Sequence, residues 1–508
     1  MIASLRDDLP QWRRIRSLTV SPELISAATA AREAGDWRAA AAAARIDVDI
    51  DLDAVRQKFG AEASAALEAD LSHLAPDLLW WHLPRHRAGM TTVLARQTLV
   101  LPPEENATQG PHLRVSTPLA PFGPQRLKLS VGSFEDLEFE RWVVMPRYTW
   151  DVRRSGELAA AWGVGDPATP EIYRLLAVGA YAEAWQHCGI AIESDEGLQP
   201  RPTLPTCPIG VAREVLDVAR AFGVEKVGAL HSSPLMFTVD DDTITGAAAE
   251  FYDLYEVPSV VVQPVPADLA LLDAGLLTPE DLHPLVRAAL PNLATPSNVT
   301  TAPSNVMTAS RVGEPDPVRV RCRGGWHLVS VESGALRLHD HSDEEVQRES
   351  VLRSLGGASA GCFAVRQTWL TGAGRLPKAL ARQARVVRER ALAGDTDWLV
   401  GGLRTGAIDP LMRDPAGWSL LHLAMLVDHD RLLPLLDAAG LPVDAQDRTG
   451  RTPLYLAIMG GARREFIQAL LDRGADPSIE TVHGADSYTA TWRGSGWVRD
   501  MLPKQGRG

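Results

Sequence analysis

Histidines close to other ligating side chains are the first candidates for chemistry in this sequence. His82 and His86 lie four positions apart, a spacing that places two imidazoles on one face of a helix, as many metal sites require. Pro84 lies between them, and the sequence there changes to a strand-like pattern, which disfavours a continuous helix. We therefore expect these histidines to be core or surface residues rather than metal ligands.

A second histidine pair occurs in His339-Asp340-His341, where two imidazoles would share one face of a strand. Asp343 or Glu344 could then supply a third metal ligand. The same segment also fits a strand end followed by a helix start, because acidic side chains favour helix N-termini. We favour the structural interpretation and predict no metal site here.

Nucleophilic catalysis is suggested by His231-Ser232-Ser233 and the aspartates at 240–242, which together span 12 positions. No GxSxG elbow is present, however, and closeness in sequence does not establish the geometry of a triad. No GxxxxGK[ST] loop occurs, and no GxGxxG follows a strand, so a nucleotide site is unsupported. The sequence leaves open whether the protein is an enzyme.

The four cysteines are widely spaced, the closest two being 19 positions apart, and they are Cys188, Cys207, Cys322 and Cys362. Because no CxxC spacing exists, we expect neither a cysteine-based zinc site nor a redox pair, and we predict no cofactor. Scattered thiols suit a reducing compartment. No signal peptide and no apolar run of membrane-spanning length is readable, so we predict a cytoplasmic protein without membrane contact.

The composition is that of a globular protein, with 508 residues, 45% of them hydrophobic and 23% charged. These values exclude a fibre, a disordered chain and a disulfide scaffold. The net charge of -13 disfavours non-specific binding to nucleic acid, whose phosphates would be repelled.

One segment opposes this acidic average. Residues 375–391 are expected to form a basic helix with a formal charge of +5, carried by Arg375, Lys378, Arg382, Arg385, Arg388 and Arg390 against Glu389. Such a helix fits a solvated face, docking onto an acidic part of the same chain, or contact with an anion or nucleic acid.

The positions of apolar residues divide the chain into segments of different texture. We expect residues 1–290 to form a mixed body that is helical at 1–80, β-rich at 82–152 with a small antiparallel sheet, and helical again at 153–290. Residues 291–317, rich in Pro, Ser, Thr and Asn, predict a linker or long loop. Residues 318–391 predict a β-hairpin around Gly324-Gly325, followed by the basic helix.

Within the first segment, residues 35–49 align with residues 179–193 at a constant offset of 144. Both stretches read as the end of a helix, a small-residue turn and a second, Ala-rich helix. A distant duplication and coincidence in an Ala-rich chain both explain the similarity, and we favour coincidence.

The most specific pattern lies at 414–478. Gly417 and Gly450 are 33 positions apart, and each closes an Asp-x-x-Gly turn. The second turn continues as Arg451-Thr452-Pro453-Leu, where Thr is suited to cap a helix and Pro to begin it. This region resembles ankyrin repeats. The resemblance covers about 392–503, and the first repeat departs from the pattern, with Ser419 for Thr and Leu420 for Pro.

The resemblance implies binding of another protein through the turn tips and the inner faces of the first helices. In this sequence those positions hold Ala416, Trp418, Leu426, Val427, Arg448, Thr449, Arg451 and Met459. Trp418 is the leading candidate because an exposed Trp usually anchors a contact. The alternative is that Trp418 packs inside the chain. His422 is expected to bond within a turn rather than to bind a ligand.

We therefore predict an α+β protein with a mixed helical and antiparallel-sheet N-terminal body and a short C-terminal α-solenoid of ankyrin repeats at 392–508. The favoured function is that of a protein–protein interaction or adaptor protein. One alternative is an enzyme in 80–390 to which the repeats recruit a macromolecular substrate. A second is a nucleic-acid-linked regulator that uses the basic helix 375–391.

Overall fold

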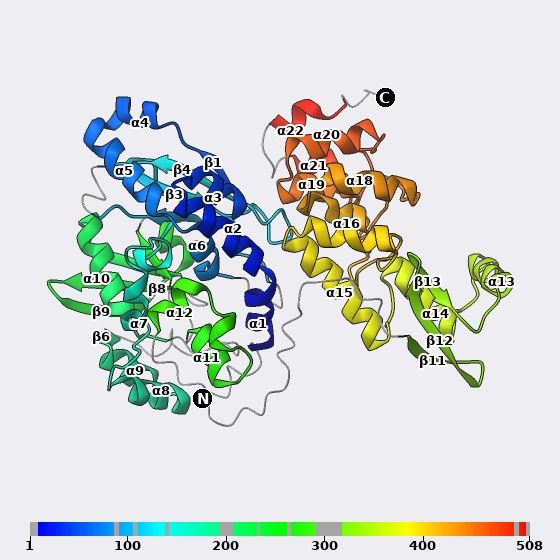
Figure 1. The fold of residues 1–508 in the computed structure, drawn as a ribbon, viewed down its shortest axis with the longest axis horizontal. Helices are drawn as coiled ribbons and strands as arrows, with labels where there is room; N and C mark the ends of the chain where they lie inside the picture. Colours follow the sequence, from blue (N-terminus) through cyan, green and yellow to red (C-terminus); the bar gives the residue numbers. More distant parts are fainter. Residues whose placement is uncertain are drawn as a thin grey trace. The chain divides into compact units, whose positions relative to one another are not determined.

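A computed structural model of the chain shows two compact units (Figure 1). It describes residues 9–85, 91–104, 110–137, 142–192, 207–230, 234–255, 257–261, 266–290, 317–491 and 497–503. Unit 1 comprises Met1–Thr117 and Arg126–Met307, and unit 2 comprises Pro118–Gln125 and Thr308–Gly508. The predicted linker at 291–317 lies outside the described residues except for its last position.

Unit 1 is built on a ten-stranded mixed sheet with the strand order β1-β4-β3-β2-β5-β10-β7-β8-β9-β6. Its four central strands, β2, β5, β10 and β7, are parallel to their neighbours within that group. The strands are β1 (Ile46–Asp49), β2 (Thr98–Leu101), β3 (His112–Ser116), β4 (Leu127–Gly132), β5 (Trp142–Val144), β6 (Ile190–Ile192), β7 (Lys226–Leu230), β8 (Leu235–Asp240), β9 (Thr243–Ala248) and β10 (Ser259–Val261).

The helices of unit 1 bury their apolar positions, as α10 illustrates. Val211, Val215, Val218 and Phe222 recur at helical spacing, and all four are buried. The helices are α1 (Leu9–Leu18), α2 (Pro22–Glu33), α3 (Trp37–Ala43), α4 (Leu52–Phe59), α5 (Ala61–His73), α6 (Pro76–His82), α7 (Leu158–Ala161), α8 (Thr169–Val178), α9 (Tyr181–His187), α10 (Val211–Phe222), α11 (Ala267–Asp273) and α12 (Pro284–Ala289). Short 3-10 turns include η2 (Phe134–Leu137), η3 (Arg147–Thr149), η4 (Ser155–Glu157) and η6 (Phe251–Tyr255).

The two halves of unit 1 have the same topology. In each half a helix pair leads into an edge strand, α2-α3-β1 in the first and α8-α9-β6 in the second. An antiparallel meander of three strands follows, β2-β3-β4 or β7-β8-β9. The edge strand pairs in parallel with the third strand of its meander, β1 with β4 and β6 with β9. Each half then has a 3-10 turn, η2 or η6, before a last strand that pairs in parallel with the first meander strand. The shared topology favours duplication over coincidence as the explanation of the 144-residue offset.

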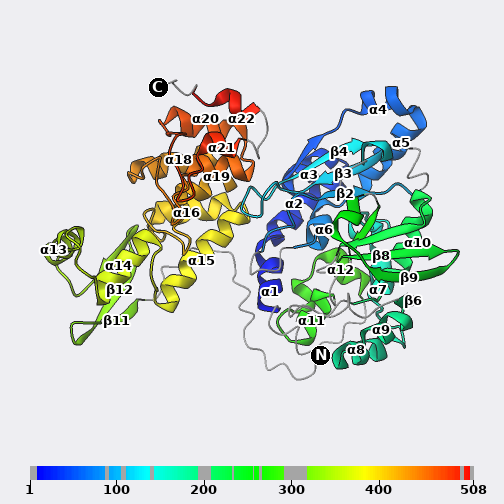
Figure 2. The same cartoon turned by 180° about the vertical axis from the view of Figure 1, so that it is seen from behind.

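The sheet corrects three expectations, the first being that residues 1–80 are helical, since they contain β1. The sheet is also larger than the small antiparallel sheet predicted at 82–152, because β5 pairs in parallel with both β2 and β10. Residues 153–290, expected to be helical, contain five of its strands, β6 to β10. These strands are short, and two of them have only three residues, so their alternation is too brief to show in sequence. Figure 2 shows β2, β3 and β4 side by side from behind.

Unit 2 begins with a three-stranded antiparallel sheet made of β11 (Val318–Cys322), β12 (Gly325–Glu332) and β13 (Ala335–Leu338). The first turn is centred on Arg323-Gly324, one residue earlier than predicted, and both residues have positive φ, 48° and 91°. Two such residues form the tight turn that matches strand twist. The predicted hairpin therefore has a third strand, and α13 (Asp343–Ser354) and α14 (Gly361–Thr371) precede the basic helix.

The rest of unit 2 is helical: α15 (Lys378–Leu392), α16 (Thr396–Thr405), α17 (Leu420–Leu423), η8 (Ala424–Leu426), α18 (His429–Ala438), α19 (Pro453–Gly460), α20 (Arg464–Asp472), α21 (Ser487–Ala490) and α22 (Trp497–Met501). Helices two places apart in sequence pack together, α16 with α18, α17 with α19, and α19 with α21. Their apolar faces form one core with the three-stranded sheet. In the described part of the chain, no helix has the length and apolarity needed to cross a membrane.

Candidate functional site

The turn at Asp447 is organised by one buried carboxylate. Its Oδ1 accepts hydrogen bonds from the backbone N–H groups of Thr449 at 2.8 Å and Arg451 at 3.0 Å. Its Oδ2 accepts from the Arg451 guanidinium at 2.7 Å. Burial alone would raise the pKa of Asp447, but these bonds outweigh it and lower the pKa. Gly450 has a φ of 79°, which allows the chain to reverse.

The turn at Asp414 repeats this geometry. Asp414 Oδ1 accepts from the N–H groups of Ala416 at 2.8 Å and Trp418 at 2.9 Å, and Gly417 has a φ of 84°. Adjacent turns are joined through their backbones, since Arg448 N donates to Ala416 O at 3.1 Å. The array of turns is therefore one hydrogen-bonded stack.

A third turn at residues 481–484 extends the stack. Val482 N donates to Thr449 O at 2.9 Å, and Gly484 has a φ of 71°. After this turn Asp486 caps α21, as the predicted start of a third repeat requires.

Residues 449–482 match the ankyrin repeat family. This chain contains an ankyrin repeat. The chain is also 45% identical over 64 residues to AGD4, an ADP-ribosylation factor GTPase-activating protein of Arabidopsis thaliana. That similarity covers 13% of this chain and 8% of the relative's length.

His422 stabilises the ankyrin turns, as predicted. Its Nδ1 accepts from the N–H of Ser419 at 3.1 Å, which leaves Nε2 to donate to Arg451 O at 3.1 Å. Burial lowers the pKa of His422 to about 4, so the ring is neutral at physiological pH. This imidazole links one turn to the next and has no nitrogen free for a ligand.

Trp418 is buried, contrary to its prediction as an exposed anchor. Only 4% of it is exposed, and its indole N–H donates to Asp447 Oδ2 at 3.1 Å. The Arg388 guanidinium lies 5.1 Å from the ring centroid. The alternative, that Trp418 packs inside the chain, is therefore the one that the structure supports.

The partner of Trp418 comes from a distant part of the sequence. Residues 118–125, which follow β3 and precede β4, belong to unit 2, and Phe122 meets the Trp418 ring edge-on with centroids 6.0 Å apart. Gly123 lies against Gly460, where an added side-chain carbon would be 2.2 Å from the Gly460 oxygen. Residues 118–125 therefore pack beside the start of α17 and against the end of α19.

The other predicted contact residues differ in accessibility. Leu426 is buried and is thus a core residue rather than a surface contact. Arg448 is exposed, whereas Thr449, Arg451 and Met459 are half-buried. Sequence reasoning missed Val482, which is 67% exposed at the tip of the third turn. The accessible candidate surface is therefore the tip of the second and third turns.

Unit 1 contains a separate candidate site, a cavity of about 740 Å³. It lies at the carboxyl ends of β2, β5 and β10, where ligands bind in many sheets with parallel strands. Pro102, Pro146 and Val260 line it from the strand ends, and Glu214 and Arg213 from α10. It coincides with the junction of the two topologically equivalent halves.

Glu214 is the group in this cavity best suited to proton transfer. Burial raises the pKa of Glu214 to about 7, although the hydroxyl of Tyr148, which donates to its Oε1, opposes that shift. A carboxyl group that titrates near neutral pH can act as a general acid or base. Arg213 lies 2.7 Å from Glu157 and so pairs with another carboxylate, and among the described residues no cation forms an ion pair with Glu214.

Two of the predicted histidine candidates, His82 and His339, lie in the described part of the chain, and each has its own local partners. His82 is buried on α6 beside a small cavity of about 50 Å³ that Glu214 also lines, and burial lowers its pKa well below 6.5. His86 and His231-Ser232-Ser233 lie outside the described residues. His339 hydrogen-bonds Ser330 Oγ at 2.6 Å and lies 3.1 Å from Glu332. Both partners are on β12, so His339 stabilises the three-stranded sheet.

Four potential metal ligands meet in unit 2, where the sequence predicted none. Cys322, His327, His341 and Cys362 are separated by 4, 13 and 20 residues, so no short motif reveals them. Burial and the neighbouring Cys322 raise the pKa of the Cys362 thiol to about 12. We name these four residues the Cys2His2 cluster.

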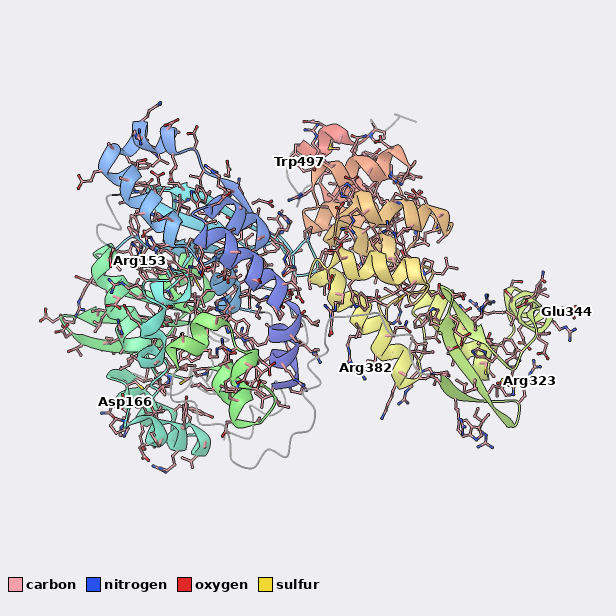
Figure 3. All side chains as sticks on the ribbon, in the orientation of Figure 1. Arg153, Asp166, Arg323, Glu344, Arg382 and Trp497 are labelled. Atoms are coloured by element: carbon pink, nitrogen blue, oxygen red, sulfur yellow. The ribbon has the colours of Figure 1, made fainter. Side chains whose placement is uncertain are left out.

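The basic helix is confirmed as α15, but it begins at Lys378, which leaves Arg375 outside it, and part of its charge is neutralised. Arg388 lies 3.1 Å from Asp414, and Arg390 is buried and lies 2.8 Å from Asp395. Arg382 is exposed, and Figure 3 shows it at the edge of α15. One face of α15 therefore contacts the turn at Asp414 and the start of α16.

Proposed function

We propose that the protein is an interaction or adaptor protein whose ankyrin repeats bind another protein through the tips of the second and third turns. The tip surface consists of Arg448, Thr449, Arg451 and Val482, with Met459 on the adjoining inner helix. The repeats form a short α-solenoid over 392–503 in this proposal. A cytoplasmic location, as the sequence predicts, completes it.

The observation that carries the proposal is the exposure of Val482 and Arg448 on a hydrogen-bonded stack. An exposed aliphatic side chain is common on its own, but the N–H of Val482 donates to the carbonyl of Thr449, the neighbour of the exposed Arg448. Arginine and apolar groups together are typical of the centre of protein interfaces. The ankyrin match supports the same class of function, since such repeats generally bind proteins.

The test is a quantitative capture experiment with matched charge reversals. Wild-type protein and an Arg448→Glu/Val482→Asp variant are used as bait for soluble proteins, and the bound proteins are quantified by mass spectrometry. The control is Arg473→Glu, because Arg473 pairs with Asp437 on the outer helices. We expect at least one protein to be captured in equal amounts by the wild type and the control. The amount captured by the tip variant should be at least tenfold lower. If the tip variant retains every such protein, the proposal is wrong.

A second candidate function is catalysis in unit 1, and the Glu214 cavity favours it. Glu214 would transfer a proton to or from the group of the substrate that enters the cavity, and Tyr148 would hold its carboxyl group in place. In this reading the ankyrin repeats recruit a macromolecular substrate.

A thermal-shift screen at pH 7 with small phosphates, carboxylates and amines tests this candidate. A ligand of the cavity should stabilise wild type, and Glu214→Gln should abolish the shift. Glu183→Gln, an exposed carboxylate outside the cavity, is the control. The candidate fails if no compound distinguishes Glu214→Gln from the control.

A further inference from the structure

The Cys2His2 cluster lies where the three-stranded sheet of unit 2 meets α14. One ligating atom from each residue lies within 4.8 Å of the ligating atoms of the other three. His327 Nδ1 and His341 Nε2 are 2.8 Å apart. Both cysteines are buried and neither forms a disulfide.

The fold itself brings these residues together. Cys322 ends β11 opposite Gly325, and His327 lies two residues further along β12 on the same face, as strand alternation requires. His341 follows β13, which pairs with β12 on its other side. Cys362 is the second residue of α14 and reaches the cluster from above this face.

A close approach between α14 and β11 is built into the backbone. Gly361 has a φ of 58°, and a side-chain carbon there would lie 2.6 Å from Cys322 Sγ. Only glycine combines this conformation with this distance. The start of α14 is therefore held directly over the cluster.

The cluster also has the outer contacts that metal-binding histidines use. His341 Nδ1 lies 3.3 Å from Glu345 Oε2, which directs Nε2 into the cluster. The His341 side chain is 2% exposed, and its ring lies 4.5 Å from that of Phe363 between centroids. A carboxylate behind an imidazole fixes the tautomer and strengthens the metal bond.

We propose that Cys322, His327, His341 and Cys362 bind a structural zinc ion. Two sulfur and two nitrogen ligands in a tetrahedral set are typical of zinc, and two thiolates with two neutral imidazoles balance its charge. With zinc bonds of about 2.0 to 2.3 Å, tetrahedral ligands lie about 3.3 to 3.8 Å apart, which the cluster reaches with small shifts. Four protein ligands leave no open position, so the ion ties β11, β12, β13 and α14 together rather than catalysing a reaction.

Metal content of the full-length protein is the first test. Protein purified under reducing conditions without chelator should contain one zinc per chain by elemental analysis. Replacement by cobalt(II) should give the intense visible bands of tetrahedral coordination and a thiolate charge-transfer band. Cys322→Ser and His341→Ala should each remove the stoichiometric metal. The matched controls, Cys188→Ser and His339→Ala, should keep it.

A second variant covers the case in which loss of a ligand prevents folding. Glu345→Gln leaves all four ligands in place, and we expect it to weaken zinc binding about 10- to 100-fold in competition with a chromogenic chelator. The proposal is overturned if wild type binds less than stoichiometric zinc after reduction and zinc addition. The proposal is also overturned if mass spectrometry of the native protein finds a Cys322–Cys362 disulfide. The same holds if Cys322→Ser, His341→Ala and Glu345→Gln all bind zinc as the wild type does.

Discussion

The turns at Asp414 and Asp447 have the same backbone but different surroundings. In both, the aspartate accepts from N–H groups two and four residues ahead, and its own N–H donates to the carbonyl four residues ahead at 3.0 Å. The residue after the glycine is Trp418 in the first turn and Arg451 in the second. Trp418 is buried against Phe122 and Arg388, whereas Arg451 is half-buried and pairs with Asp447.

This difference shows that the repeat pattern specifies the turn but not its role. The first turn is covered by residues 118–125 and α15 of the same chain, so its aromatic side chain stabilises the fold. The second turn and the third lack an aromatic residue at this position and expose Arg448 and Val482. We conclude that the first turn is a packing contact within the chain. We propose that the other two turns form the surface that binds a partner.

The largest effect is expected at the tryptophan of the internal turn. Trp418→Ala should lower the free energy of unfolding of unit 2 by about 3 to 5 kcal/mol, because truncating a buried aromatic ring leaves a cavity. Hydrogen exchange of α17 to α20 in urea measures this loss. Trp326→Ala is the control, since Trp326 is 67% exposed and should change stability by less than about 0.5 kcal/mol. Equal losses of stability for Trp418→Ala and Trp326→Ala would contradict the conclusion that Trp418 packs inside the chain.

The two aspartates should respond to pH in opposite directions. Asp447→Asn should cost about 1.5 to 3 kcal/mol at pH 7, since hydrogen bonds to a charged group are lost. The pKa of Asp447 is lowered from its ordinary value of 3.8, so its contribution is present above pH 3.8 and is lost as the pH falls through the folded-state pKa. The stability gap between wild type and Asp447→Asn should therefore close in acid.

Burial instead raises the pKa of Asp414, so ionising it costs stability as the pH rises from 3.8. The stability of Asp414→Asn relative to wild type should thus improve between pH 3 and 7. Urea unfolding of both variants across this range checks the pair. The same sign of pH dependence for both would contradict the comparison.

A smaller effect is expected at the segment that covers the first turn. Phe122→Ala should destabilise unit 2 by about 0.5 to 1.5 kcal/mol, the usual worth of an aromatic pair. The amides of 414–423 should exchange faster, and those of 447–456 should not. Leu119→Ala, which removes a side chain that is 42% exposed, is the control from the same segment. Equal exchange in both turns would show that Phe122 does not distinguish them.

The smallest effect on stability is expected at the outward tip. Arg448→Glu should change the unfolding free energy by less than about 0.5 kcal/mol, because its side chain is exposed and, within the described residues, hydrogen-bonds a single group, Pro415 O, at 3.1 Å. Thermal unfolding beside wild type measures this. A large loss would mean that Arg448 joins the turns and is not free for a partner.

Local patterns in the sequence predicted local structure well. Ser21 caps α2, Thr452 caps α19 and Pro453 begins it, as predicted, because capping depends on a few adjacent residues. The apolar spacing of α10 likewise predicted its buried face. The ankyrin turns are of the same kind, since Asp and Gly act within a single turn.

Features made by distant contacts could not be predicted in this way. The burial of Trp418 depends on Phe122, 296 positions away, and no periodicity links them. The Cys2His2 cluster spans 322–362 and is assembled by strand pairing and one glycine. The shared topology of the two halves of unit 1 is visible in the sequence only as the 144-residue offset, because the short strands carry little pattern.

The proposal of an outward turn tip is tested most directly by site-specific cross-linking. A photoreactive amino acid is placed at position 448 of the full-length protein, and in separate variants at the exposed outer position 473 and the exposed position 326. We predict that position 448 cross-links to a partner protein in a cell lysate, and that the other two positions do not. The account would be contradicted if position 473 captured the same partner as efficiently as position 448. It would also be contradicted if position 448 captured no partner.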